Sequence, residues 1–190
     1  LALLACAIRM LTEAGYVYIG MDHFALPDDE LARAQRHGTL QRNFMGYTTH
    51  AQTDLIGVGV SAISHVGSTF SQNPRELSAW EAAIDAGTLP ACRGVWLDAD
   101  DILRADVIQS LMCHGYVAIP EIETRYGIEF ATYFASSLAQ LEPLAADGLV
   151  RIARDRIEVT DVGRLLLRNV AMCFDRYLEA ATVVPLSRAI

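Results

Sequence analysis

Two short apolar runs punctuated by glycine constrain the fold of this chain most. Residues 16–21 read YVYIGM, and residues 55–63 read LIGVGVSAI. Runs of this length and content are typical of strands that are buried on both faces of a parallel sheet. A polar segment that begins with acidic residues lies between them, as expected of a helix that crosses over between parallel strands. We therefore predict an α/β fold with paired parallel strands before residue 65.

The first 70 residues are predicted as helix, strand, helix and strand, which is the end of an α/β barrel or sheet. The expected elements are a helix at 1–15, a strand at 16–21, a helix at 28–37 ending at Gly38, a loop at 39–53 and a strand at 55–60.

The opening helix reads LALLACAIRM. It is too short to span a bilayer and lacks the basic start of a signal peptide, so it is interpreted as a core helix. Because it begins with Leu and has no capping residue, we expect the chain to be a piece of a longer protein.

The pattern becomes helical from Asn73 onward. A short helix, a strand or linker, and a long helix capped by Asp98 are expected first. Two helices, a hairpin and a last helix capped by Thr160 follow, which is the order of a winged-helix-like module. The expected helices are at 76–86, 99–114, 122–126, 130–147 (kinked or broken at Pro143) and 161–179. The expected strands are at 149–153 and 156–159, and residues 88–97 are a short strand or a linker. We predict parts at 1–70, 71–97 and 98–190, the last mainly helical.

The charge of the chain argues against nucleic acid and anionic membranes as partners. The formal net charge is −8, from 23 acidic and 15 basic residues, whereas phosphate neutralisation needs an excess of Lys and Arg. Arginines near the predicted hairpin alternate with carboxylates, which favours a solvated face of mixed charge over a DNA-binding surface.

The four cysteines lie far apart in the sequence, so they form no local metal pattern and no redox pair. Cys113 and Cys173 fall on apolar helix faces and are predicted to be buried, inert thiols. This usage is typical of a reducing cytoplasm.

Polar groups follow the first predicted strand and fill the next loop. Asp22 and His23 come directly after the strand, where residues face the active end of a barrel. A structural Asp–His hydrogen bond is an equally open interpretation. The loop NFMGYTTH at 43–50 offers hydroxyl and imidazole groups for binding, or is a polar surface loop.

Gly57 and Gly59 lie in the second apolar run without the third glycine of a dinucleotide fingerprint. They allow either close packing of a helix or the approach of a flat ligand to the backbone.

Four phrases together resemble one family, the oxygen-independent coproporphyrinogen III oxidases: GMDHFALPDDELA, NFMGYTT, DLIGVGVSAIS and GRLLLRNVAMCFD. The resemblance implies the last strands and helices of a radical-SAM barrel and a C-terminal domain. It also implies heme biosynthesis chemistry, in which two propionates of coproporphyrinogen III become vinyl groups. The cofactors implied are S-adenosylmethionine and a [4Fe-4S] cluster.

The resemblance also implies roles for particular residues. Ile63 matches a position that contacts the adenosyl part of the cofactor, and the strand end with Gly57 and Gly59 lines the same site. Met45 is also a candidate cofactor contact, but it occupies a position where many members carry Gln, so a polar contact there is not expected. Asp22 and His23 are candidates for the tetrapyrrole pocket.

The family holds its cluster with a closely spaced cysteine triplet, which this chain lacks. We therefore expect no metal site and no catalysis by the chain alone, and we expect a missing N-terminal barrel half as its partner. Unpaired strand surface predicts self-association. Three alternatives stay open: a heme chaperone of the same superfamily, a winged-helix regulator and a structural interaction domain.

Overall fold

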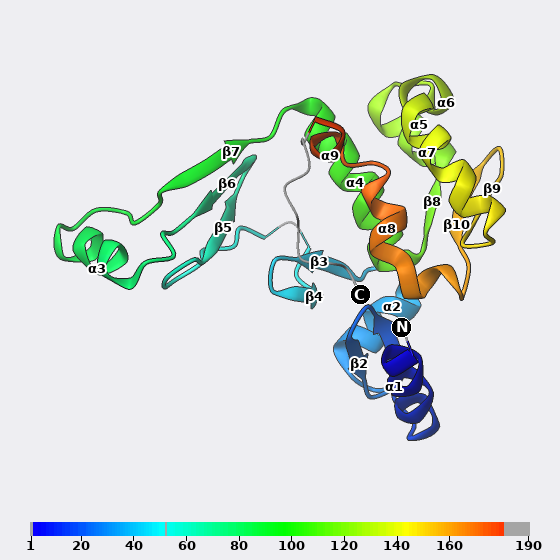
Figure 1. Ribbon diagram of the computed structural model, residues 1–190, viewed down its shortest axis with the longest axis horizontal. Helices are drawn as coiled ribbons and strands as arrows, with labels where there is room; N and C mark the ends of the chain where they lie inside the picture. The colour runs from blue at the N-terminus through cyan, green and yellow to red at the C-terminus, as the bar shows by residue number, and fades with distance from the viewer. Residues whose placement is uncertain (1, 52, 181–190) are drawn as a thin grey trace. The chain divides into compact units, whose positions relative to one another are not determined.

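The computed structural model describes residues 2–51 and 53–180, which form a mixed α/β structure (Figure 1). The chain divides into two compact units. The first unit combines residues 1–49 with 103–190, and the second unit covers residues 50–102. The predicted functional division at 1–70, 71–97 and 98–190 stays a prediction.

The N-terminal part of the first unit alternates helices and strands. Its elements are α1 (Ala2–Glu13), β1 (Val17–Gly20), β2 (His23–Ala25), α2 (Glu30–His37), β3 (Gln41–Asn43) and β4 (Gly46–Thr48). Helix α2 starts two residues later than predicted, and the side chain of Asp29 caps it. Gly38 ends the helix in the left-handed conformation, as the sequence predicts. The hairpin β3–β4 lies within the predicted loop and was not expected.

Helix α1 is not the predicted core helix, because none of its described residues is buried. It contacts β1. The apolar composition of a helix shows that it can be buried, but it does not show which other element would cover it.

The C-terminal part of the first unit surrounds a three-stranded antiparallel sheet in the order β8-β10-β9. Helix α4 has the bounds that the sequence predicts, and Asp98 and Asp101 cap its start reciprocally. The elements are α4 (Ala99–His114), β8 (Tyr116–Ala118), α5 (Ile119–Tyr126), α6 (Phe130–Tyr133), α7 (Ala135–Ala146), β9 (Val150–Ile152), β10 (Arg156–Val159), a 3-10 turn (Gly163–Leu166), α8 (Leu167–Met172) and α9 (Arg176–Ala180).

Two predicted helices in this part are broken at other places than expected. Helix α7 runs through Pro143, and the break lies at Phe134, whose side chain is fully buried. The expected helix at 161–179 is divided near Phe174, which is also fully buried. In both places a buried aromatic side chain sits at the break, so tertiary packing overrides the local helical pattern.

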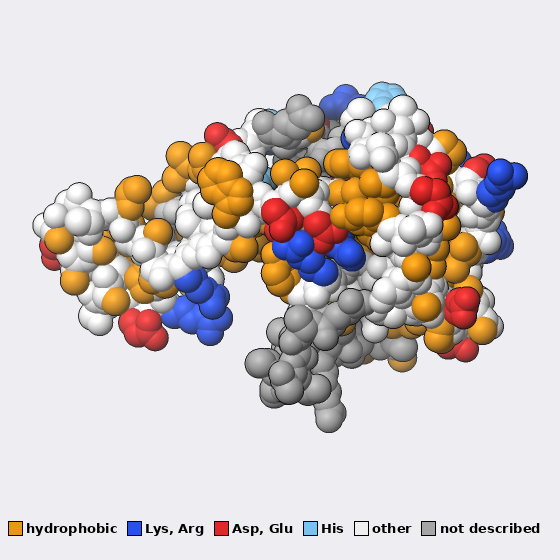
Figure 2. Space-filling model, turned by 90° about the horizontal axis from the view of Figure 1, so that it is seen from above, with side chains coloured by type: hydrophobic (Ala, Val, Ile, Leu, Met, Phe, Trp, Pro, Cys, Tyr) orange, Lys and Arg blue, Asp and Glu red, His pale blue; other side chains and the backbone are white. Residues whose placement is uncertain are grey.

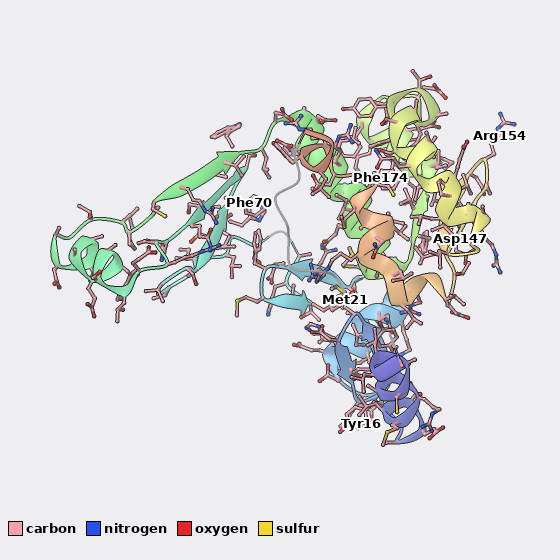
Figure 3. All side chains as sticks on the ribbon, in the orientation of Figure 1. Tyr16, Met21, Phe70, Asp147, Arg154 and Phe174 are labelled. Carbon is pink, nitrogen blue, oxygen red and sulfur yellow. The ribbon has the colours of Figure 1, made fainter. Side chains whose placement is uncertain are left out.

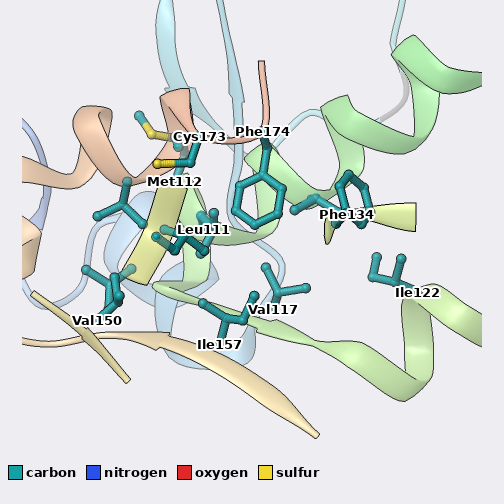
Figure 4. Packing of buried hydrophobic residues seen from close by; sticks show 14 of the residues in the cluster. Leu111, Met112, Val117, Ile122, Phe134, Val150, Ile157, Cys173 and Phe174 are labelled. Carbon is teal, nitrogen blue, oxygen red and sulfur yellow. The ribbon is translucent and has the colours of Figure 1, made fainter. Parts of the chain in front are cut away.

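The main core lies between the helices and this sheet (Figure 4). Leu111 on α4, Val117 on β8 and Ile157 on β10 are completely buried there. Rings of Phe134 and Phe174 meet edge to face, with centroids 5.4 Å apart. The core therefore joins residues that are distant in sequence.

The second unit is built on another antiparallel sheet, in the order β5-β6-β7. Its elements are β5 (Ile63–Val66), β6 (Thr69–Gln72), α3 (Leu77–Asp85) and β7 (Arg93–Trp96). Strand β7 resolves the open choice between a strand and a linker at residues 88–97.

The predicted strand at 55–60 and its parallel pairing are wrong. All strand pairs among the described residues are antiparallel, and Leu55 makes only an isolated bridge to His65. Ile56 and Val58 are 75% and 85% exposed. A continuous apolar run indicates that a segment can be buried between two layers, but the partner strands must come from elsewhere.

No described helix is long and apolar enough to cross a membrane.

Candidate functional site

Asp22 and His23 form a hydrogen-bonded pair at the turn between β1 and β2. The Nδ1 atom of His23 lies 2.8 Å from Oδ1 of Asp22. The Asp22 side chain is 84% exposed and that of His23 is 34% exposed. Met21, just before the pair, has a φ of 53°, which is unusual outside glycine. The turn therefore presents an oriented imidazole at the surface of the first unit.

The hairpin β3–β4 lies against this imidazole. A Cβ atom added to Gly46 would be 2.6 Å from Nε2 of His23, so only glycine allows this approach. The rings of His23 and Tyr47 meet edge to face, with centroids 5.1 Å apart. The structure thus brings the predicted pocket residues Asp22 and His23 together with the loop that the sequence analysis singled out.

Met45 is at the tip of the same hairpin. Its side chain is 82% exposed, and its backbone N–H donates to Oδ1 of Asn43 over 2.8 Å. Met45 is therefore placed as an exposed apolar group beside Gly46.

Tyr47 is the buried member of this cluster. Its hydroxyl donates to the carbonyl oxygen of Met112 over 2.9 Å. A Cβ atom on Gly20 would lie 2.4 Å from that hydroxyl. Burial raises the pKa of Tyr47 to about 12, so the phenol stays neutral at physiological pH. Met21, which follows Gly20 in the chain and is labelled in Figure 3, packs against the main core.

Arg42 is a member of this cluster that sequence reasoning missed. It pairs with Tyr47 across the β3–β4 hairpin, and its guanidinium carbon lies 5.8 Å from the centre of the Tyr47 ring. Its Nε atom is buried and has no hydrogen-bond partner. The hairpin register alone would reveal the pairing, and that register was not expected from the sequence.

Gly57 and Ile63 come together in the second unit. A Cβ atom on Gly57 would be 2.6 Å from the backbone oxygen of Ile63, and the Gly57 N–H donates to the hydroxyl of Ser64 over 3.0 Å. Residue 57 must therefore be glycine because the backbone of Ile63 occupies the place where a side chain would lie.

Gly59 differs from Gly57. It has a φ of +101°, and no atom lies within 4 Å of the place where its Cβ would be. Its carbonyl oxygen accepts a hydrogen bond from Asn73 Nδ2 over 2.8 Å. Gly59 thus holds an open stretch of backbone in a fixed conformation.

The residues present do not fit an iron–sulfur cluster. Within the described part of the chain, no group of three or more His, Cys, Asp or Glu side chains gathers to hold a metal ion. Cys6 and Cys92 are exposed, whereas Cys113 and Cys173 are buried as predicted. Burial raises the pKa of the Cys113 thiol to about 12 and also raises that of Cys173.

Comparison with known proteins identifies relatives along the entire chain. Residues 97–166 match the family model of the HemN C-terminal domain. The oxygen-independent coproporphyrinogen III oxidase of Pseudomonas aeruginosa is 50% identical over 190 residues, which is 100% of this chain and 41% of the relative. The chain is homologous to the oxygen-independent coproporphyrinogen III oxidases. The resemblance seen in the sequence is therefore confirmed.

Further oxidases give the same result. The Thermostichus vulcanus oxidase is 46% identical over 191 residues, covering 100% of this chain and 59% of the relative. A solved structure described as coproporphyrinogen III oxidase (HemN) from Escherichia coli, a radical SAM enzyme, is 51% identical with a TM-score of 0.87. The match covers 92% of this chain and 40% of the solved chain. The chain thus spans about two fifths of the length of most of these oxidases.

Proposed function

We propose that this chain is the end of the radical-SAM barrel and the C-terminal domain of an oxygen-independent coproporphyrinogen III oxidase. Such an enzyme converts two propionates of coproporphyrinogen III to vinyl groups and gives protoporphyrinogen IX. The observation that carries the proposal is that the similarity to oxidases extends over the whole chain, beyond residues 97–166.

The exposed apolar segment of the second unit supports the barrel assignment. Ile56 and Val58 project from a segment that pairs with no described strand beyond one bridge. Strands supplied by the part of the oxidases that this chain does not match would cover them.

The C-terminal part is proposed as a winged-helix-like domain that covers the barrel mouth. The sheet β8-β10-β9 with helices α4, α5 and α7 supports this arrangement. A DNA-binding role has less support, because Arg156 stacks on Tyr116 and Arg151 lies 4.0 Å from Glu158. Arg154, at the tip of the hairpin, points away from the protein (Figure 3).

Ile63 and Gly59 are proposed to form part of the wall around S-adenosylmethionine. Ile63 supplies apolar surface, and the open backbone at Gly59 leaves room for a flat adenine. Gly57 packs against Ile63 and would support the wall from behind. When bound with a reduced [4Fe-4S] cluster, S-adenosylmethionine supplies the one-electron chemistry of these enzymes.

Asp22 and His23 are proposed to bind the tetrapyrrole. The Asp22 carboxylate orients the imidazole through Nδ1, and Gly46 leaves space for the ring. Because Asp22 holds the Nδ1–H, His23 donates to a propionate from Nε2–H in its imidazolium form, and the second carboxylate oxygen of Asp22 can accept from a pyrrole N–H. Because the described residues offer no cluster ligands, we infer that the chain alone is catalytically silent. The reducing cytoplasm is the proposed compartment, consistent with four free cysteines.

A chimera tests the proposal. The chain replaces the matching 40% of the Escherichia coli oxidase, and conversion of coproporphyrinogen III is followed without oxygen. We expect an active enzyme. In the chimera, Ile63→Asp should weaken the binding of S-adenosylmethionine, which equilibrium dialysis measures. Ile152→Asp changes a half-exposed residue on β9 and should leave binding unchanged.

Two further measurements separate the alternatives. The isolated chain, incubated with iron, sulfide and S-adenosylmethionine, should give no cluster absorption and no cofactor cleavage. Tight heme binding by the chimera without turnover would favour a heme chaperone instead. A folded, cluster-containing chimera that neither turns over substrate nor binds it would overturn the proposal.

A further inference from the structure

Arg42 carries a positive charge that nothing in the described part of the chain neutralises. It lies in β3 with intermediate exposure, and its Nε atom is buried without a hydrogen-bond partner. No ion pair or hydrogen bond engages the other guanidinium nitrogens among the described residues. Burying an N–H donor without a hydrogen-bond partner is costly, so this placement of the Arg42 Nε calls for an explanation.

Two groups near this guanidinium, Tyr47 and Cys113, are neutral. Tyr47 offers the face of its ring, at 5.8 Å from the guanidinium carbon. Cys113 also lies within electrostatic reach of Arg42. Burial raises the pKa of both Tyr47 and Cys113 to about 12, so neither becomes an anion at neutral pH. The stacked ring and the thiol hold Arg42 in place but leave its charge uncompensated.

The same tyrosine links Arg42 to the proposed tetrapyrrole pocket. The ring of Tyr47 contacts Arg42 and also meets the imidazole of His23. Arg42 and His23 therefore flank one buried aromatic residue. The Nε atom of Arg42 is buried, but its two terminal nitrogens, which also lack a hydrogen-bond partner within the part of the chain that the structure describes, are not among the buried unpartnered atoms. The terminal nitrogens therefore retain access to solvent.

We propose that Arg42 binds a carboxylate of the substrate, in the pocket that Asp22 and His23 begin. The inference rests on the proposed function and names the chemical group that the pocket takes, a propionate. A guanidinium binds a carboxylate through two parallel N–H donors, which a single ammonium group cannot reproduce. Tyr47 acts as a positioning residue, because its ring and its bond to Met112 fix where Arg42 lies.

Binding of coproporphyrin III, the oxidised and coloured form of the substrate, tests the proposal on the isolated chain. Arg42→Met should raise the Kd for coproporphyrin III by on the order of 10- to 100-fold, since hydrogen bonds to charged groups are strong. Arg42→Lys keeps the positive charge and should raise the Kd by a smaller factor than Arg42→Met. The tetramethyl ester, in the same dilute detergent, should bind wild type and Arg42→Met equally weakly. Arg33→Met, at an exposed position of helix α2, should bind as wild type does.

Thermal unfolding distinguishes a binding role from a structural one. The buried Nε–H of Arg42 has no partner and so costs stability, and Arg42→Met should therefore unfold at the same or a higher temperature than wild type. A structural role predicts a lower temperature. Equal binding of the acid by wild type and Arg42→Met, absence of binding by wild type, or a lower unfolding temperature that accounts for lost binding would overturn the proposal.

The chimera separates this inference from the proposed function. Arg42→Met in the active chimera should raise KM. An active chimera whose KM does not change would overturn only the role of Arg42. An inactive, folded chimera with the wild-type residue would instead overturn the proposed function.

Discussion

The hydroxyl of Tyr47 donates a hydrogen bond to the carbonyl oxygen of Met112 over 2.9 Å. Met112 lies in the last turn of α4, where carbonyl groups have no partner within the helix. The bond therefore satisfies a helix end and ties the hairpin β3–β4 to the C-terminal part of the first unit. Through Tyr47, the surface that carries Asp22 and His23 has a fixed position relative to α4.

Replacing Tyr47 with Phe should destabilise the chain by about 1–2 kcal/mol. The change removes one buried hydrogen bond and leaves the Met112 carbonyl without its donor, while the ring contacts remain. Urea unfolding followed by circular dichroism measures the loss. Tyr116→Phe is the control, because Tyr116 is 39% exposed and should change stability by less than about 0.5 kcal/mol. Equal effects of the two changes would contradict the role assigned to the Tyr47 hydroxyl.

Alkaline pH should destabilise the first unit through Tyr47 and Cys113. Burial raises the pKa of Tyr47 from 10.0 to about 12 and that of Cys113 from 9.0 to about 12. The folded state therefore keeps both protons at a pH where the unfolded state loses them. Their stabilisation is complete below about pH 9 and is lost as the pH rises to about 12, at about 1.4 kcal/mol per unit of pKa difference.

The double variant Tyr47→Phe, Cys113→Ala tests this pH dependence. Its free energy of unfolding, measured between about pH 8 and 11, should fall less steeply with pH than that of wild type. Parallel curves for the two proteins would show that these groups do not titrate differently in the folded and unfolded states.

Local chemistry predicted much of the fold. The sequence predicts helices at 28–37 and 99–114 because their end signals lie beside the segments themselves, as Gly38 and Asp98 show. The hairpin at 149–159 was recognised from its alternation and turn. These signals act over a few residues and need no distant partner.

Partners that lie far away in the sequence were not predictable. The apolar run at 55–60 indicates burial but does not say which strands pair with it, and the parallel pairing was wrong. The candidate site shows the same division. The Asp22–His23 pair was recognised because the two residues are adjacent, whereas the unpaired guanidinium of Arg42 depends on the β3–β4 register and on Cys113.

Gly46→Ala should destabilise the hairpin and displace His23. Gly46 has a φ of +127°, and a Cβ atom there would lie 2.6 Å from Nε2 of His23. Strain and contact together should cost about 1–3 kcal/mol. Gly148→Ala is the matched control, since Gly148 also has a positive φ but no atom within 4 Å of the Cβ position. Only Gly46→Ala should shift the NMR signals of the His23 ring, and an unchanged ring would contradict the close approach.

Exposed apolar side chains of the second unit should drive self-association of the isolated chain. Several hydrophobic side chains lie exposed, among polar and charged ones, on the part of the molecule that holds β5, β6, β7 and α3 (Figure 2). Val58 is 85% exposed and Trp96 is 75% exposed, the latter on the edge strand β7. An edge strand with apolar side chains is a template for pairing with another chain.

Sedimentation velocity at rising protein concentration should therefore show species larger than a monomer. Val58→Lys should shift the distribution toward monomer, because a charge on the exposed run disfavours its burial against another chain. Val162→Lys adds the same charge at a residue of the first unit that is 62% exposed, and it should leave association unchanged. The comparison matters because added charge alone can reduce association through repulsion. A monomer at every concentration, or equal effects of the two lysines, would mean that the apolar run of the second unit does not mediate contact between chains.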